Sequence, residues 1–364
     1  MSEHEDSKDL KAQPRQERKG WQGCLLGTGI VAGSLTLFLC LLLGLSWAGG
    51  NRARAELAAK YPPPGQMVDM GGYRLHIHCQ GAKEPGIPTV VLEAGAREFS
   101  LVWDQVQGQV AQFALVCAYD RAGMGWSERG SNPRTAPYVA DELDALLAAA
   151  GVGPPYVLVG HSMGGLYARY YTHEHPERVV GIVLVDSGHE ERNWRLPETL
   201  MRLDEQMNQI LRILPVVSAM GMTARDPDGY PSPFLPPLAP STEERYKAVV
   251  AMSPHYATAI VEEGDALEKS YAALRNLPDR SLGDLLLIVL SAGKFEALPE
   301  ELISAEEQVQ ARAIEAELQA DLVSLSSNGR QVIAEESGHH IQLEQPELVI
   351  EAIREVVEAA QELD

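Results

Sequence analysis

The pentapeptide Gly160-His161-Ser162-Met163-Gly164 constrains the fold of this chain more than any other stretch of its sequence. It follows the apolar run Tyr156 to Val159, and a helical pattern from about Gly165 to His175 follows it. Glycines flanking a serine in this way are typical of a sharp turn from a strand into a helix, because they let the two elements approach closely. We therefore predict that Ser162 is presented at the end of a strand, beside the first amides of a helix.

Strand and helix patterns alternate along the rest of the chain. The later strand candidates are near-continuous runs of Val, Leu and Ile, which are typical of strands buried on both faces of a parallel sheet. The alternation predicts right-handed strand-helix-strand crossovers and an open α/β sheet. The predicted strands are Gln66 to Met70, Tyr73 to Cys79, Thr89 to Glu93, Ala114 to Tyr119, Tyr156 to Val159, Val179 to Val185, Leu285 to Leu290 and Arg330 to Glu335, and the predicted helices are Tyr138 to Ala150, Gly165 to His175, Ser304 to Leu325 and Glu347 to Ala360.

One segment interrupts this alternation. From about Glu190 to Arg280 no strand pattern occurs, proline recurs, and helical patterns predominate around Glu198 to Leu214 and Thr242 to Asn276. We interpret residues 190–280 as a helical cap inserted into one α/β domain that covers residues 66–364. Such a cap would close over the turn that carries Ser162 and shape a substrate pocket.

The N-terminal part predicts a membrane anchor. Residues 1–20 are polar, and no charged residue occurs from Cys24 to Ala48, so residues 21–48 fit one transmembrane helix with Trp21 and Trp47 near its ends. Residues 49–65 are interpreted as a stalk. Lysines and arginines are more frequent before the apolar run than after it, which places the N-terminus in the cytoplasm and the domain outside. The alternative is a secreted protein whose signal is cleaved near Ser46-Trp47-Ala48.

The formal net charge of -21 argues against a nucleic-acid partner, since such binding requires basic surface. The segment Asp120 to Ser127 has spaced glycines, but it lacks the arrangement of a phosphate-binding loop. No cluster of His, Cys and Asp has the spacing of zinc ligands. We expect neither a cofactor nor a metal.

A serine becomes a nucleophile when a base accepts its proton. His339 follows the last predicted strand and precedes the last helix, where the carboxyl ends of parallel strands bring loops together. Gly338 gives the backbone freedom before it, so we predict His339, rather than His340, as the base. For the carboxylate that orients the base, Glu296 after the Leu285 to Leu290 strand is ranked ahead of Asp186.

An oxyanion formed during acyl transfer needs two amide donors. The N–H of Met163, which follows the nucleophile, is the first candidate. The second is the N–H of Ala96, in the loop after the Thr89 to Glu93 strand, where Gly95 lets the backbone come close.

Together these residues resemble the α/β-hydrolase superfamily, in particular its cap-bearing serine hydrolases, over about residues 66–360. The resemblance rests on Gly160 to Gly165, on Asp120-Arg121-x-Gly123-x-Gly125-x-Ser127, and on Gly338-His339 with Leu343-Glu344-x-Pro346. It implies an eight-stranded, mostly parallel sheet, a Ser-acid-His triad and no cofactor. In that topology the second and fourth strands are neighbours, which implies a contact between Cys79 and Cys117.

The chain departs from the family pattern at two places. Ala94-Gly95 stands where the family has His-Gly, and Glu296 stands where it has Asp. The expected function is that of a membrane-anchored serine hydrolase acting on a small acyl substrate, with an oligomeric state that the sequence leaves open. An acyltransferase or a peptidase on the same triad, and a non-catalytic binding protein, are the alternatives.

Overall fold

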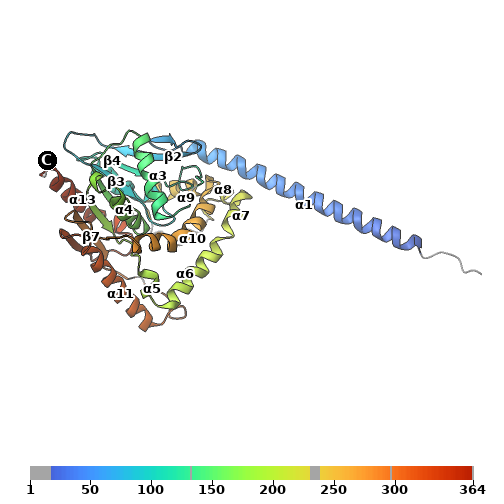
Figure 1. Ribbon diagram of the computed structural model, residues 1–364. Coiled ribbons are helices and arrows are strands. Elements are labelled where there is room, and N and C mark those ends of the chain that lie inside the picture. The colour runs from blue at the N-terminus through green and yellow to red at the C-terminus, as the bar shows by residue number, and fades with distance from the viewer. Residues whose placement is uncertain (1–17, 132, 230–237, 296, 363–364) are drawn as a thin grey trace, which may run out of the picture.

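A computed structural model describes residues 18–131, 133–229, 238–295 and 297–362, with side chains from residue 31 onward. Figure 1 shows a globular part from which one long helix, α1 (Arg18–Lys60), projects. Of the described residues, Val31–Lys60 form the one helix that is long and apolar enough to cross a membrane.

The globular part is built on one eight-stranded sheet with the order β1-β2-β4-β3-β5-β6-β7-β8. The pairs β1–β2 and β2–β4 are antiparallel and the others are parallel, which confirms the predicted α/β fold. The strands are β1 (Gln66–Asp69), β2 (Arg74–Gln80), β3 (Thr89–Glu93), β4 (Val116–Tyr119), β5 (Tyr156–His161), β6 (Val179–Val185), β7 (Leu286–Ala292) and β8 (Gly329–Ala334).

Side chains of the central strands alternate between two apolar cores, one on each face of the sheet. Val157 and Val159 of β5 face one core, whereas Leu158 between them faces the other. This period of two follows from strand geometry, and burial on both faces explains why the strands are almost continuously apolar. The helices outside the segment between β6 and β7 are α2 (Asp104–Val110), α3 (Ala136–Ala149), α4 (Met163–Glu174), α11 (Ala305–Val323), α12 (Ile341–Glu344), α13 (Pro346–Gln361) and the 3-10 helices η1 (Ser100–Trp103) and η2 (Pro176–Arg178).

In the described part of the segment between β6 and β7, the regular elements are all helices, joined by turns and loops. Its helices are α5 (Arg192–Arg195), α6 (Glu198–Leu211), α7 (Leu214–Ala219), α8 (Met222–Arg225), α9 (Pro240–Met252) and α10 (Tyr256–Arg275). The pattern from Thr242 to Asn276 had predicted one helix, but the chain forms α9 and α10. Pro254 lies at the break, and proline both lacks an N–H and disfavours a helical residue before it.

Residues 49–60, predicted as part of a stalk, continue α1 without a break and pack against the cap. The contact with α8 is close: a Cβ on Gly50 would lie 2.3 Å from Cα of Gly221. Ser46 Oγ also donates a hydrogen bond to the carbonyl of Met220 at 3.1 Å. This segment is therefore part of the folded domain rather than a free spacer.

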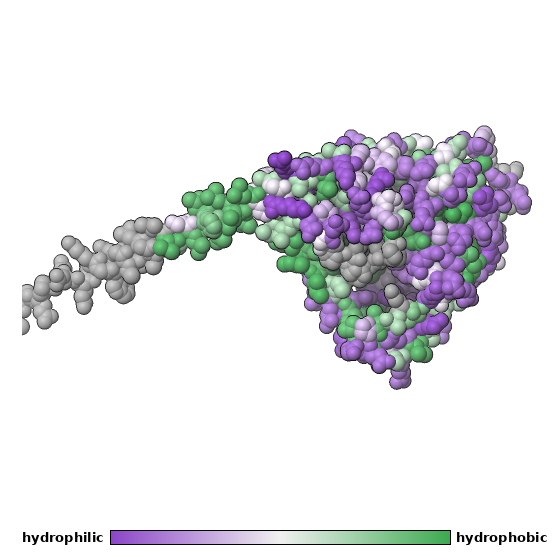
Figure 2. Space-filling view, turned by 180° about the vertical axis from the view of Figure 1, so that it is seen from behind, coloured by the Kyte–Doolittle hydropathy of each residue, from purple (hydrophilic) through white to green (hydrophobic). Residues whose placement is uncertain are grey.

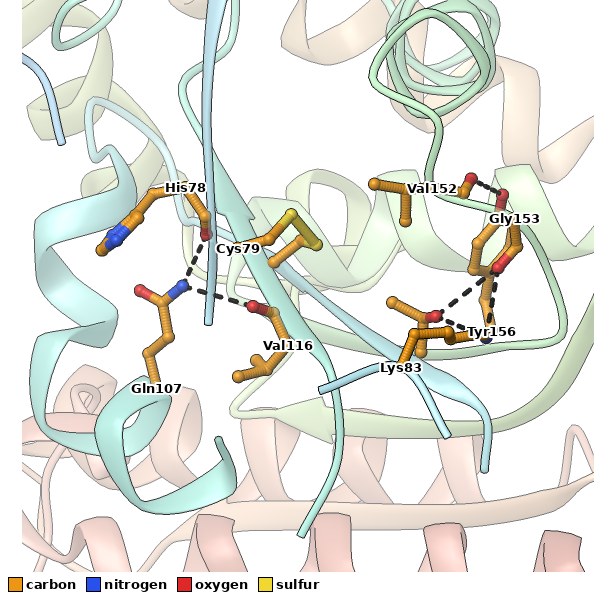
Figure 3. The surroundings of a disulfide bond; sticks show 10 residues. His78, Cys79, Lys83, Gln107, Val116, Val152, Gly153 and Tyr156 are labelled. Carbon is orange, nitrogen blue, oxygen red and sulfur yellow. Dashed lines mark hydrogen bonds between the residues drawn. A yellow bond between two sulfur atoms is a disulfide. The ribbon is translucent and has the colours of Figure 1, made fainter. Parts of the chain in front are cut away.

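Cys79 of β2 and Cys117 of β4 lie directly opposite each other, which confirms the contact that the family resemblance implied, and they form a disulfide (Figure 3). Next to it, the side-chain amide of Gln107 donates to the carbonyl of His78 at 2.6 Å, so α2 is tied to the same pair of strands.

Candidate active site

Ser162 lies at the turn between β5 and α4 with a φ of 51°, a left-handed conformation that costs energy for a residue other than glycine. The flanking glycines allow this turn: a Cβ on Gly160 would lie 2.6 Å from Cα of Gly165, and one on Gly164 would lie 2.4 Å from the carbonyl oxygen of Glu93. The Ser162 side chain consequently points away from the sheet, at the N-terminus of α4.

His339 lies in the loop between β8 and α12, next to Ser162. Its Nε2 is 3.0 Å from Ser162 Oγ, and its Nδ1 is 2.6 Å from Oδ2 of Asp186. When Nδ1–H donates to Asp186, Nε2 is left to accept the proton of the serine hydroxyl. The structure thus brings together the predicted nucleophile and base, which are 177 positions apart in the chain.

The carboxylate beside His339 is Asp186, which sequence analysis had ranked second. Asp186 follows β6 with a φ of 40°, and the N–H of Ala292 at the end of β7 donates to its Oδ1 at 3.0 Å. Glu296, ranked first, lies outside the described residues. Since Nδ1 of His339 is already bonded to Asp186, the geometry reverses that ranking.

The contact between His339 and Asp186 shifts their two pKa values in opposite directions. Desolvation by itself would lower the pKa of His339, but the hydrogen bond and the negative charge of Asp186 outweigh it and raise that pKa. Burial of Asp186 would raise its pKa, but the bond with His339 dominates and lowers it. Asp186 therefore stays ionised where His339 titrates.

Met163 is the first residue of α4, so its N–H belongs to the first-turn amides that have no acceptor within the helix. Ala96 is exposed in the loop after β3. The amides on both sides of it have partners: Gly95 N–H donates to Glu98 at 2.9 Å and Arg97 N–H donates to Glu263 of α10 at 3.0 Å. These bonds fix the loop backbone around Ala96.

The buried side chain of Arg121 binds the backbone of the same loop. The guanidinium of Arg121 donates to the carbonyls of Ala94 and Gly95, each at 2.7 Å, and to the carboxylates of Glu93 and Glu263, each also at 2.7 Å. Burial outweighs the charge of Arg121 and raises the pKa of Glu93 to about 7. Arg121 therefore links the sheet, the oxyanion-loop candidate and the cap.

Glu98, in the loop after β3, is buried and connects three segments of the site. Its carboxylate accepts hydrogen bonds from Nδ1 of His161, Nε2 of His340 and the N–H of Gly95, each at 2.9 Å. Nε2 of His161 is in turn 2.9 Å from the carbonyl oxygen of His339. Sequence spacing gave no sign of this network, because its members come from three segments that are far apart in the chain: the loop after β3, the end of β5 and the loop after β8.

Glu98, His161 and His340 also offer three ligand atoms within 4.8 Å of one another. A tetrahedral metal would hold nitrogen and oxygen ligands about 3.4 Å apart, given metal–ligand distances near 2.1 Å. The 2.9 Å separations and the N–H of Gly95 on the same carboxylate instead fit hydrogen bonds. We interpret the cluster as a polar network that supports the site.

The sequence profile of the Alpha/beta hydrolase family matches residues 84–352, and the chain belongs to this family. A protein of Gibberella zeae named as an AB hydrolase superfamily protein is 26% identical over 290 residues, covering 75% of this chain and 87% of the relative. The chain spans far less of some other relatives: a match of 36% identity to a Hormonema carpetanum protein with a transporter name covers 36% of this chain and 20% of that protein.

Solved structures share the fold at low sequence identity. A thermophilic esterase from Thermogutta terrifontis superposes with a TM-score of 0.54 at 21% identity, covering 81% of this chain and 97% of the esterase. The epoxide hydrolase CorEH superposes with a TM-score of 0.52 at 17% identity, covering 80% and 96%. The family and these neighbours support hydrolase activity in general, while the fold alone does not select the bond that is cleaved.

Proposed function

We propose that this protein is a membrane-anchored serine hydrolase that cleaves a carboxylic ester or a similar acyl bond through an acyl-enzyme. The observation that carries the proposal is the chain of contacts from Ser162 Oγ to Nε2 of His339 at 3.0 Å and from Nδ1 to Asp186 at 2.6 Å. A nucleophile, a base and an orienting carboxylate at these distances are what covalent acyl transfer requires.

In the proposed reaction, Ser162 Oγ attacks the acyl carbon while Nε2 of His339 takes the hydroxyl proton. Asp186 stabilises the imidazolium that forms, and the N–H groups of Met163 and Ala96 bind the oxyanion. His339 then returns the proton to the leaving group as the tetrahedral intermediate collapses. Water, activated by His339, repeats the sequence and releases the acid.

The acidic net charge of the protein bears on the kind of substrate that it can bind. An acidic protein repels strongly anionic molecules, so we propose a small or medium neutral acyl substrate. The name of the Thermogutta terrifontis neighbour, an esterase, is consistent with an ester bond.

We also propose that the hydrolase domain lies on the extracytoplasmic side, anchored by α1. Two observations support this side: basic residues are enriched before the apolar run, and the domain contains the Cys79–Cys117 disulfide, which persists in oxidising compartments. A secreted form cleaved after the apolar run would have the same domain outside. Protection of the domain from protease added to intact cells would contradict this orientation.

A fluorophosphonate probe tests the proposed chemistry, because it forms a covalent bond with an activated serine. We expect labelling of the wild type and of Ser327→Ala, an exposed serine outside the site, and loss of labelling in Ser162→Ala. Hydrolysis of p-nitrophenyl esters of increasing acyl length should show the same pattern. An unlabelled wild type, or labelling that survives in Ser162→Ala, would favour the non-catalytic alternative.

A further inference from the structure

The cap carries an apolar face that the folded domain leaves exposed. Four large side chains at the end of α6 and in the segment through α8 make up this face, which we call the cap face: Ile210 (63% exposed), Ile213 (58%), Val216 (56%) and Met222 (50%). The same segment already buries Leu211 inside the domain. Apolar side chains on both sides of one segment are unusual beside water and indicate a second apolar contact.

The cap face is continuous with the membrane helix. The segment Met220–Met222 packs against α1 at Ser46 and Gly50, close to Trp47, where the apolar run ends. Arg225 of α8 donates to the carbonyl of Ser46 at the same level. Figure 2 shows hydrophobic surface extending from the helix onto the adjoining side of the globular part.

The charge of the segment sets it apart from the rest of the molecule. The chain contains 51 Asp and Glu residues, but none lies between Gln206 and Arg225, and the charged residues there are Arg212 and Arg225. A carboxylate is costly to bury in the acyl layer, whereas arginine can keep its charge at the headgroup level while its stem lies in an apolar layer. A carboxylate-free apolar segment in such an acidic chain fits a bilayer better than a protein partner.

We propose that the cap face rests on the bilayer from which α1 emerges, so that the cap is a second, interfacial membrane contact. This inference depends on α1 spanning the membrane, which belongs to the proposed function. If Trp47 marks the interface, residues Met220–Met222 lie at the depth of the headgroups, because they contact α1 on both sides of that residue. Ile213 and Val216 then enter the outer edge of the acyl layer.

This contact has a consequence for the site. Asn208 of α6 accepts a hydrogen bond from the guanidinium of Arg97 at 2.6 Å, and Arg97 directly follows the oxyanion candidate Ala96. Asn208 lies within one helical turn of the end of α6, so the helix end that meets the lipid is close to the contact with the loop after β3. A substrate that partitions into the bilayer would meet the enzyme where the cap already touches the membrane.

The test uses the full chain in lipid nanodiscs, with the fluorophore NBD attached to single cysteines and doxyl-labelled lipids as quenchers. In a Cys24→Ser, Cys40→Ser background, Ile213→Cys and Val216→Cys report on the cap face. Ile333→Cys is the matched control, since this β8 isoleucine is 51% exposed at the sheet edge opposite β1. Native Cys40, labelled in a Cys24→Ser protein, reports on α1. Circular dichroism confirms that each labelled protein is folded.

We expect NBD at positions 40, 213 and 216 to lose most of its emission in doxyl-lipid nanodiscs and to be blue-shifted without the quencher, while NBD at position 333 does neither. Quenching at 40 together with responses at 213 and 216 no larger than at 333 would overturn the cap-face contact and leave the anchor intact. An unquenched probe at 40 would overturn the membrane span itself. Neither result affects the fluorophosphonate test of Ser162, so failure of the cap-face contact, of the membrane span and of the serine hydrolase chemistry can be told apart.

Discussion

Backbone strain is concentrated in the candidate site. Among the described residues, the non-glycine positions with positive φ are Arg97, Ser162 and Asp186, with values of 64°, 51° and 40°. Each lies just after a strand or at the loop that follows one, where surrounding hydrogen bonds impose the conformation. Strain of this kind persists where the structure over-determines it, and it commonly marks functional positions.

Replacing Asp186 tests which carboxylate orients the base. We expect Asp186→Asn to lower kcat by about 10⁴-fold, because an amide no longer favours the productive tautomer or the imidazolium. Activity requires neutral His339, so it is lost as pH falls through the raised pKa of that residue. Removing the Asp186 charge lowers that pKa, and the acid limb of kcat against pH should shift to lower pH.

Glu296→Gln is the matched comparison for this substitution. We expect its kcat and its pH profile to stay close to the wild type. A loss of turnover in Glu296→Gln while Asp186→Asn remains active, with both proteins folded by circular dichroism, would restore Glu296 as the orienting carboxylate.

Glu98 is predicted to be a positioning residue that acts through His161, His340 and the Gly95 loop. Its negative charge also contributes to the raised pKa of His339. Glu98→Gln cannot accept all three hydrogen bonds, so we expect kcat to fall by roughly 10–100-fold, equivalent to about 1.4–2.7 kcal/mol, with a smaller change in KM. The acid limb should again move to lower pH.

The control for Glu98 is Glu336→Gln, which removes the same charge from an exposed side chain paired with Lys294 at 2.8 Å. This variant should keep the wild-type pH profile. If Glu98→Gln lowers kcat but leaves the pH dependence of kcat unchanged, Glu98 supports the fold without acting on the base.

At the scale of elements, the cap is attached to its surroundings on two sides. Glu263 of α10 binds both Arg121 and the N–H of Arg97, which connects the cap to the loop after β3. On the other side, Gly50 and Gly221 let α1 and α8 meet backbone to backbone. The cap is therefore positioned by α1 as well as by the sheet domain.

Gly50→Ala should loosen this attachment. The added Cβ would lie 2.3 Å from Gly221 Cα, so α8 has to move, and we expect a loss of about 1–3 kcal/mol in unfolding free energy. Gly44→Ala is the control in the same helix, because nothing lies within 4 Å of its added Cβ. That variant should be unchanged or stabilised by up to about 1 kcal/mol through helix propensity. Thermal unfolding in detergent measures both, and equal Tm values would contradict the close contact.

At the scale of the whole molecule, the disulfide joins β2 and β4, the strands nearest to the edge strand β1. It closes a loop with a sequence separation of 38. A crosslink of this span restricts the unfolded chain and contributes about 2–4 kcal/mol. The central strands, in contrast, are held by apolar packing on the two faces of the sheet.

We expect dithiothreitol to lower the unfolding free energy of the wild type by about 2–4 kcal/mol, measured in urea at fixed detergent. The double variant Cys79→Ser, Cys117→Ser should match the reduced wild type and respond no further to reductant. Cys40→Ser, which alters a free cysteine in α1, should retain the full response. A wild type indifferent to reduction would contradict a stabilising role for this bond.

Local sequence patterns predicted the α/β class, the eight strands in their order along the chain, the apolar N-terminal helix and the turn at Ser162. These features depend on local periodicity, on glycine spacing and on the length of apolar runs, all of which are properties of neighbouring residues. The tertiary structure alone decided the carboxylate beside His339, the burial of Glu98 and the packing of α1 on the cap. Each of these joins segments that are far apart in the chain, and loop conformation, rather than any spacing along the chain, sets which side chains meet there. Asp186 directly follows β6 and Glu296 comes four positions after the end of β7, so both come after a strand and the choice between them required the position of His339 in space.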